Sequence, residues 1–266
     1  MARLRRLDAE LVRRRLARSR EHAARLVLEG RVTVAGSIAA KPATQVDPAV
    51  GIAVTPDDDD PGYASRGGFK LAGALDHFTD LPVTGRRCLD AGASTGGFTD
   101  VLLRRGAEHV VAVDVGYGQL VWALQRDERV TVLDRQNIRQ LTPEQVAPAP
   151  ELVVADLSFI SLALVLPALV LCADPKADLL LMVKPQFEVG RERLGSGGVV
   201  RDPSTRADAV RPVAEAAERF ELGVRGVVAS SLPGPSGNVE YFVWFTAGAP
   251  PLAEADLDRA VAEGPR

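Results

Sequence analysis

The chain has 266 residues, 46% of them apolar and 25% charged, which is typical of a globular protein with one large domain or two small ones. Its two cysteines and three histidines exclude a disulfide framework and a cysteine- or histidine-rich metal site, so no metal is expected. The net charge of −3 hides an asymmetry: residues 1–45 hold 11 Lys and Arg against 4 Asp and Glu, a net of +7, and the remainder carries −10. A basic head indicates contact with a polyanion, although a solvated helix face explains the charge equally well.

No segment is predicted to enter a membrane. The longest apolar run, residues 162–173, is broken by Pro167 and is shorter than the roughly 20 residues that a membrane span needs. The N-terminus is basic but lacks the apolar stretch of a secretory signal. The chain is therefore expected to be soluble and cytoplasmic. A monomer is favoured, although the sequence does not determine the oligomeric state.

Residues 3–30 are predicted to form two helices, because apolar side chains recur there at intervals of three and four. Ser19 can cap the second helix and Gly30 ends it. Val32 and Val34 alternate as in a short strand, and Gly36 favours a turn after it.

A linker is predicted where four aspartates, residues 57–60, precede Pro61-Gly62. We therefore divide the chain into a small domain over residues 1–58, an acidic linker over 59–64, a larger domain over 65–248 and a C-terminal tail over 249–266.

The larger domain is predicted to hold a mainly parallel, doubly wound α/β sheet. Seven apolar segments are typical of strands, and the first five alternate with segments of helix length. The last two have a short connection rich in Pro and Gly, so we expect them to pair antiparallel at one edge. The predicted strands cover residues 87–90, 109–114, 130–133, 152–156, 179–183, 224–230 and 241–246.

A glycine-rich turn follows the first predicted strand and opens a helix. Its glycines let the backbone approach a ligand at the helix N-terminus. Ser94 stands where the dinucleotide fingerprint has its second glycine. The Asp90 carboxylate is a poor neighbour for a pyrophosphate, but it suits the ammonium and sulfonium groups of S-adenosylmethionine. The turn therefore favours S-adenosylmethionine as cofactor.

Two further acids end the next two strands. Asp114 can accept both ribose hydroxyls of such a cofactor, and Asp134 can accept its adenine amino group. The alternative is a glycine-rich turn that binds no ligand. The predicted cofactor residues are Asp90, Gly92, Ser94, Thr95, Gly96, Gly97, Asp114, Gly116, Asp134 and Asn137.

Four more charged residues are expected near this rim. Asp156 and Lys184 end the fourth and fifth strands, Glu240 begins the last, and Lys70 lies just ahead of the sheet. Ligands of such folds bind outside the carboxyl ends of the strands, so Asp156 and Lys184 are predicted to meet on adjacent parallel strands. A purely structural Lys–Asp pair is the alternative.

Methylation of a sugar hydroxyl explains why two lysines and two acids would gather. Such hydroxyls are very weak acids, so a positioned base must remove the proton as the new bond forms. A lysine accepts that proton only when neutral, and its reference pKa is about 10.4. A second lysine can depress the pKa of the first and stabilise the developing oxyanion.

The four residues Lys70, Asp156, Lys184 and Glu240 match, in order and context, the K-D-K-E tetrad of the FtsJ/RrmJ-type ribose 2′-O-methyltransferases. Longer runs resemble the TlyA family of ribosomal RNA methyltransferases, whose S4-like RNA-binding domain is similar to the segment 19–42. The resemblance covers about residues 3–245, and its motifs lie at residues 88–99, 114–120, 155–161, 184–188 and 232–241.

The resemblance implies a Rossmann-like methyltransferase sheet with an antiparallel edge strand, preceded by a small α+β S4-like domain. The implied activity is methyl transfer from S-adenosylmethionine to the ribose 2′-OH of cytidines in 16S and 23S rRNA within ribosomal subunits. Lys184 would be the base, tuned by the other three tetrad residues. The residues expected to bind RNA are Arg5, Arg6, Arg13, Arg14, Arg18, Arg20, Lys41 and Arg66.

Two positions depart from the family pattern. Pro61-Gly62-Tyr63-Ala64 replaces a linker that is often of the Arg-Ala-Trp-Val type, and Phe69 replaces a histidine found in some relatives. Three other functions remain possible readings. An NAD(P)-dependent oxidoreductase would leave the tetrad unexplained. A pore-forming haemolysin would need a spanning helix or amphipathic barrel strands, and the sequence predicts neither. An rRNA-binding protein without activity is contradicted only by the four filled tetrad positions.

Overall fold

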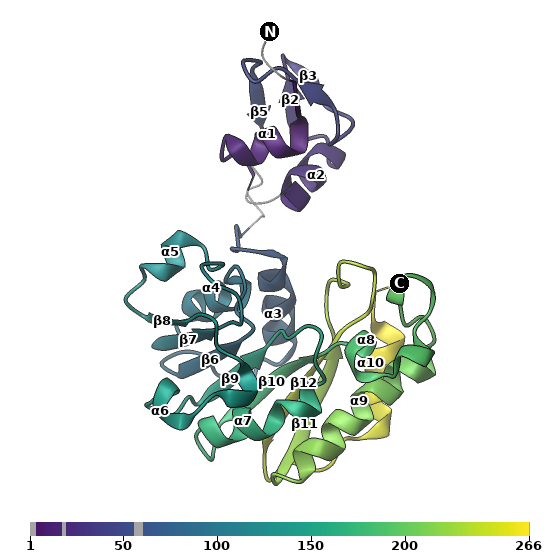
Figure 1. Ribbon diagram of the computed structural model, residues 1–266. Helices are drawn as coiled ribbons and strands as arrows, with labels where there is room; N and C mark the ends of the chain where they lie inside the picture. The colour runs from purple at the N-terminus through teal and green to yellow at the C-terminus, as the bar shows by residue number, and fades with distance from the viewer. Residues whose placement is uncertain (1–3, 18–19, 56–60, 266) are drawn as a thin grey trace. The chain divides into compact units, whose positions relative to one another are not determined.

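The computed structural model describes residues 4–17, 20–55 and 61–265 (Figure 1). The chain divides into two compact units, Met1–Gly62 and Tyr63–Arg266. Three sequence predictions lie outside the described residues: the RNA contact of Arg18, the helix cap at Ser19 and the aspartates 57–60.

The described part of the first unit contains the two predicted helices and the predicted strand at Val32 and Val34, together with four short strands that were not predicted from the sequence. A small apolar core that includes Leu7, Leu11 and Leu26 holds them together. Gly30 and Gly36 have positive φ angles of 70° and 81°, which glycine adopts without strain at these turns. The elements are β1 (Arg5–Arg6), α1 (Leu7–Arg13), α2 (Arg20–Leu28), β2 (Val32–Val34), β3 (Ser37–Ile38), β4 (Gln45–Val46) and β5 (Ile52–Val54).

The second unit contains a seven-stranded sheet with helices between the strands. Its strands are β6 (Arg87–Ala91), β7 (His109–Val113), β8 (Val130–Leu133), β9 (Leu152–Ala155), β10 (Asp178–Val183), β11 (Leu222–Ala229) and β12 (Tyr241–Ala247). Its α-helices are α3 (Arg66–His77), α4 (Gly97–Arg104), α5 (Trp122–Gln125), α6 (Pro143–Val146), α7 (Leu166–Cys172), α8 (Pro185–Glu188), α9 (Pro203–Glu218) and α10 (Glu254–Glu263). Single 3₁₀ turns are η1 (Ile138–Gln140), η2 (Leu162–Leu164), η3 (Arg191–Arg193) and η4 (Ser196–Gly198).

The strand order is β11-β12-β10-β9-β6-β7-β8, and all seven predicted strands are confirmed to within two residues at each end. The strands from β6 to β10 pair in parallel. β12 runs antiparallel to both of its neighbours, β10 and β11. The predicted antiparallel pair is therefore present at one edge, with the reversed strand second from that edge.

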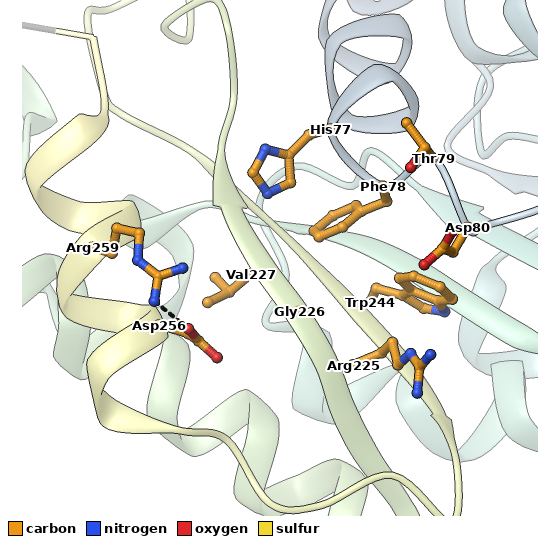
Figure 2. Close-up of a pocket in the computed structure, with 10 residues that line it drawn as sticks. All are labelled: His77, Phe78, Thr79, Asp80, Arg225, Gly226, Val227, Trp244, Asp256 and Arg259. Carbon is orange, nitrogen blue, oxygen red and sulfur yellow. Dashed lines mark hydrogen bonds and ion pairs between the residues drawn. The ribbon is translucent and has the colours of Figure 1, made fainter.

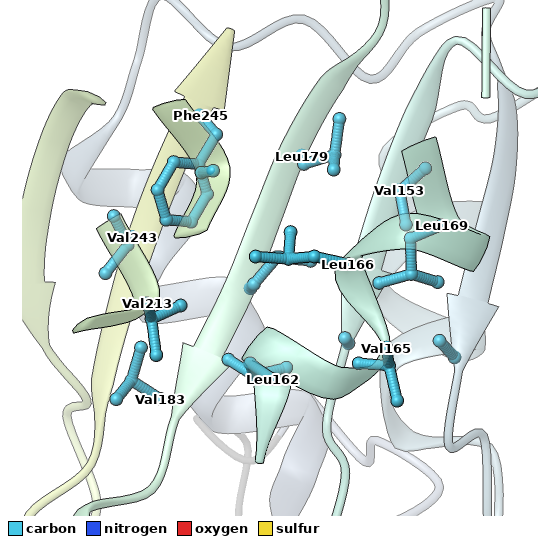
Figure 3. Packing of buried hydrophobic residues seen from close by; sticks show 14 of the residues in the cluster. Val153, Leu162, Val165, Leu166, Leu169, Leu179, Val183, Val213, Val243 and Phe245 are labelled. Atoms are coloured by element: carbon cyan, nitrogen blue, oxygen red, sulfur yellow. The ribbon is translucent and has the colours of Figure 1, made fainter. Parts of the chain in front are cut away.

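Successive residues of the strands face two separate cores, as the strand period of two requires. Leu152 and Val154 of β9 face α3 and α4, whereas Val153 and Ala155 face α7 and α9 on the other side of the sheet (Figure 1). Figure 3 shows the second core, where η2 and α7 pack against β9 and β10. This packing fixes the ends of β9 and β10, where two of the tetrad residues lie.

The segment 249–266 differs from the tail expected from the sequence, because it contains α10. Leu257 and Ala260 of this helix are buried and belong to the core that covers one face of the sheet. Their spacing of three residues places both on the same helix face. Within the described ranges, no helix is long and apolar enough to cross a membrane.

Candidate active site

The turn after β6 has a conformation and a packing that require glycine. Gly92 has a φ of 89°, and a Cβ atom there would lie 2.6 Å from the backbone oxygen of Asp156. Gly96 has a φ of 97° and leaves no room for a Cβ beside Leu124. The turn therefore lies directly against the end of β9 and opens α4.

Asp90 is fully buried at the end of β6. Its Oδ2 accepts a hydrogen bond from the Thr99 hydroxyl at 2.6 Å, while its Oδ1 is buried with no hydrogen-bond partner among the described residues. Burial raises the pKa of Asp90 to about 7, against the opposing effect of the Thr99 hydrogen bond. A buried oxygen without a partner is costly, so this atom is suited to meet a donor or a cation.

The two other acids at strand ends are held by backbone amides. Asp114 accepts from the N–H of Ser94 at 2.8 Å and from that of Gly116 at 2.7 Å, and it remains partly exposed. Asp134 accepts from the N–H of Gly118 at 2.9 Å. Both carboxylates are therefore fixed in direction and retain lone pairs for further donors.

The remaining predicted cofactor residues lie around the same turn and the loop after β8. Ser94 and Thr95 are exposed, and Gly97 begins α4. Asn137 is exposed and uses its Oδ1 to cap η1 through the N–H of Arg139. Three acids and a glycine cradle, with Oδ1 of Asp90 buried and without a partner among the described residues, fit the positive charge of S-adenosylmethionine.

The tetrad consists of two ion pairs. Nζ of Lys70 lies 2.5 Å from Oε2 of Glu240, and Nζ of Lys184 lies 2.5 Å from Oδ1 of Asp156. The side chains of Lys70 and Glu240 are 7% and 1% exposed, and those of Lys184 and Asp156 are 10% and 23% exposed. The predicted meeting of Lys184 and Asp156 on adjacent parallel strands is confirmed.

The fold explains how residues so distant in the sequence meet. Val183 pairs with Tyr241 in the antiparallel register, so the residues beyond this pair, Lys184 and Glu240, leave the sheet at the same end. The first turn of α3 comes to the same place, because a Cβ on Gly67 would lie 3.6 Å from the Asp156 carboxylate. Lys70 follows Gly67 by three residues, which is nearly one helical turn.

Two residues near the tetrad are absent from the sequence prediction. The Ser158 hydroxyl accepts a hydrogen bond from Nζ of Lys184 at 3.0 Å. Phe159 is 90% exposed and lies 5.0 Å, between ring centroids, from Phe187. The available signal for both residues is their position in the sequence, two and three residues after Asp156 in the loop after β9.

Asp8 binds two of the arginines predicted to contact RNA. Its side chain is 6% exposed and accepts from Arg6 at 2.7 Å and from Arg20 at 3.1 Å. The hydrogen bond from Arg6 is the main cause that lowers the pKa of Asp8 to about 2. The side chains of Arg6 and Arg20 remain 46% and 60% exposed, so their outer faces are accessible to a second anion.

Glu10 binds two more of these arginines, Arg13 and Arg14, which differ in exposure. Hydrogen bonds led by that from Arg13 lower the pKa of this fully buried acid to about 2. The Arg13 side chain is 47% exposed. Arg14 is only 20% exposed, and it also donates to the carbonyl groups of Pro48 and Val50 at 2.7 Å each. Arg14 therefore stabilises the first unit, because it links Glu10 of α1 to the segment of residues 48–50.

The other predicted RNA contacts are placed separately. Arg5 and Lys41 are exposed in the first unit. Arg66 begins α3 in the second unit and donates to the carbonyl of Pro233 at 3.1 Å.

A separate pocket lies between the end of α3, β11, β12 and α10 (Figure 2). Phe78 packs on Trp244 there, and Arg225 lies over the Trp244 ring. None of the predicted site residues lines this pocket. The carboxyl end of the sheet therefore remains the candidate active site.

The strand order, the glycine turn and the acids at the strand ends together define the fold and site of a methyltransferase. Comparison with known families agrees, since the FtsJ-like methyltransferase family matches residues 63–247 and the S4 domain matches residues 5–50. The chain is 56% identical over 271 aligned residues to the 16S/23S rRNA (cytidine-2′-O)-methyltransferase TlyA of Mycobacterium tuberculosis, with both chains covered completely. This protein belongs to the FtsJ-like methyltransferases and, among them, to the TlyA family.

Two further relatives carry a haemolysin name. The chain is 36% identical over 186 residues to hemolysin A of Brachyspira hyodysenteriae, which covers 69% of this chain and 76% of the relative. A solved structure described as a "putative hemolysin" from Streptococcus thermophilus is 35% identical with a TM-score of 0.78, covering 99% of this chain and 96% of the other. The family and fold predicted from the sequence are therefore confirmed.

Proposed function

We propose that this protein transfers a methyl group from S-adenosylmethionine to the ribose 2′-OH of cytidines in 16S and 23S ribosomal RNA, in the cytoplasm. The observation that carries the proposal is the pairing of Lys70 with Glu240 and of Lys184 with Asp156 at the carboxyl end of the sheet. The identity to a relative named for this activity, over the full length of both chains, supports it.

The cofactor would be held by the acids at the ends of β6, β7 and β8. Asp114 would accept the ribose hydroxyls, Asp134 the adenine amino group, and the spare Oδ1 of Asp90 would face the cationic end of the ligand. When bound, S-adenosylmethionine supplies a methyl group activated by its sulfonium. The protein residues then have to orient the ribose hydroxyl and remove its proton.

Lys184 would accept that proton at Nζ. Its ammonium group is held by Asp156 and Ser158, which fix its position, and a lysine acts as a base once it has lost its own proton. Lys70 brings a second positive charge to the rim and can stabilise the developing oxyanion, with Glu240 fixing its direction. Both ion pairs are thus assigned to positioning and charge balance around one proton transfer.

RNA would be bound by groups of two kinds. The exposed faces of Arg6, Arg13 and Arg20 can contact phosphates, which sets position without reading sequence. At the rim, the exposed ring of Phe159 offers a surface on which an unstacked base can lie. Because a base can stack on this ring only when it has left its own helical stack, a target nucleotide in a single-stranded or splayed conformation fits this site best.

The decisive experiment is mass mapping of ribose methylation on rRNA. Ribosomal subunits from cells that lack the protein are incubated with S-adenosylmethionine and either the full chain or its Lys184→Ala variant. We expect new 2′-O-methylcytidine with the full chain alone. Absence of methylation together with intact rRNA binding would identify a silent rRNA-binding protein instead. Fluorescence quenching by NADH but not by S-adenosylmethionine would favour an oxidoreductase.

A further inference from the structure

Glu188 joins the two loops that carry Asp156 and Lys184. It ends α8, four residues after Lys184, and its carboxylate reaches across to the loop after β9. Oε2 accepts from the Ser161 hydroxyl at 2.6 Å, and Oε1 accepts from the N–H of Leu162 at 2.8 Å. Both oxygens of one side chain thus bind one short segment.

That segment is anchored in the core on its far side. Leu162 begins η2 and is 2% exposed, and Figure 3 shows it beside Val165 and Val183. Ser161 caps η2 by accepting from the N–H of Ala163. Residues 157–161 therefore span a fixed gap between the end of β9 and a turn that Glu188 holds.

The middle of this loop has a conformation that it would not adopt alone. Phe159 has a φ of 64°, a left-handed value that is rare and unfavourable for a bulky aromatic residue. Such a conformation persists only where neighbouring contacts enforce it. The contacts on either side are the Ser158 hydroxyl bound by Lys184 and the Ser161–Leu162 pair bound by Glu188.

We propose that Glu188 is a positioning residue for methyl transfer: its carboxylate locks the loop 157–161 and so holds Ser158 and Asp156 against Lys184. The inference rests on the proposed function, in which Nζ of Lys184 accepts the proton. The Glu188 carboxylate makes no hydrogen bond with the side chain of Lys184 or of Asp156 in the part of the chain that the structure describes, so it acts through the loop. Burial raises the pKa of Glu188, so its charge is held there at a cost that the two hydrogen bonds oppose.

The test compares Glu188→Ala with two variants, Glu188→Gln and Asp178→Ala. Glutamine keeps an oxygen for the N–H of Leu162 and an amide that can donate to Ser161. Asp178 is a matched control, because it is a buried carboxylate with two donors, Arg86 and Trp244, at the opposite end of the same strand, β10. Its loss lowers stability without touching the loop 157–161.

We expect Glu188→Ala to lower kcat by about 10- to 100-fold, because small displacements of reacting groups have effects of this size, with KM for S-adenosylmethionine within about threefold. Glu188→Gln and Asp178→Ala should retain kcat within about threefold. A Glu188→Gln variant as slow as Glu188→Ala, or a Glu188→Ala variant as fast as Asp178→Ala, would overturn the inference. If Glu188→Ala fails to fold, Ser161→Ala tests the same lock, and an unchanged kcat in that variant also overturns it.

A second readout does not depend on activity. Amide hydrogen exchange over residues 162–165 should accelerate in Glu188→Ala but not in Asp178→Ala, because these N–H groups are hydrogen-bonded to Glu188 or within the turn that it holds, and local opening frees them. If the unaltered chain methylates nothing, the proposed function fails while this measurement still tests the lock. Equal exchange in the two variants would contradict the role of Glu188 whatever the activity.

Discussion

Both units of this protein pair buried carboxylates with basic side chains, but they expose the pairs differently. In the Asp8–Arg20 pair of the first unit the acid is buried and the base is exposed: the Asp8 side chain is 6% exposed and that of Arg20 is 60% exposed. In the Lys70–Glu240 pair of the candidate active site both members are buried, since their side chains are 7% and 1% exposed.

This difference in exposure suits the first kind of pair to binding an external ligand and the second kind to holding catalytic groups in place. An exposed guanidinium can keep its buried carboxylate partner and still bind a phosphate. Its phosphate contact is exposed to solvent, so it weakens as the salt concentration rises. A pair that is buried on both sides cannot lose one member without leaving an unpaired charge, which is strongly destabilising. The first unit is thus suited to adjustable contact with RNA, and the second to a fixed arrangement of charges.

The largest effect is expected from Lys184→Ala. A general base contributes typically about 10²–10⁴-fold to the rate. The single-turnover rate of methyl transfer should therefore fall by about 10²-fold or more, while the affinities for cofactor and RNA stay within a few fold. Lys184→Arg should be nearly as slow, because a guanidinium keeps the charge but accepts no proton at usable pH. An Arg variant that keeps most of the activity would show that Lys184 acts by charge or position alone.

The next largest effect is expected from Asp90→Ala. The variant removes the buried acceptor that we assign to the cationic end of the cofactor, and charge-assisted hydrogen bonds contribute about 1.5–3 kcal/mol. Affinity for S-adenosylmethionine, measured by calorimetry, should therefore weaken by about tenfold or more. Thr99→Val is the control, since it removes the hydroxyl that binds Oδ2 but leaves the carboxylate. Unchanged affinity in Asp90→Ala would refute the placement.

A smaller effect is expected from Arg20→Ala compared with Arg14→Ala. Arg20 is open, so its loss should weaken rRNA binding and reduce the slope of log K against log salt by about one unit or less. Arg14 is 20% exposed and holds two carbonyl groups, so its loss should lower the melting temperature of the first unit instead. An equal salt slope in the unaltered chain, Arg20→Ala and Arg14→Ala would show that Arg20 only solvates its helix and does not contact phosphate.

The smallest effect is a pH dependence of stability. Asp90 has a raised pKa of about 7 when folded, so between about pH 4 and 7 the folded chain binds a proton that the unfolded chain has lost. This contribution to stability is present at low pH and disappears as the pH rises through 7. Asp90→Asn should lack this slope, and thermal unfolding at pH 5, 6, 7 and 8 measures it. Parallel curves for the two proteins would contradict the raised pKa.

The strands could be predicted from sequence because strands buried on both faces are continuous apolar runs, as in residues 152–155. Their ends then placed Asp156 and Lys184 on one rim. The roles of Ser158, Phe159 and Glu188 could not be predicted, because they depend on contacts between two loops. The C-terminal helix was also not predicted, because its place depends on the packing of Leu257 and Ala260 in the core beside the sheet.

The direction of β12 has a consequence for how the protein is made. The reversed strand supplies its first residues to the rim where the parallel strands supply their last, so Glu240 comes from late in the chain although Lys70 comes from early in it. During synthesis, Lys70 emerges 170 residues before the carboxylate that neutralises it. A growing chain thus acquires its S4 domain and the glycine turn after β6 first, and the tetrad is completed only as translation nears its end.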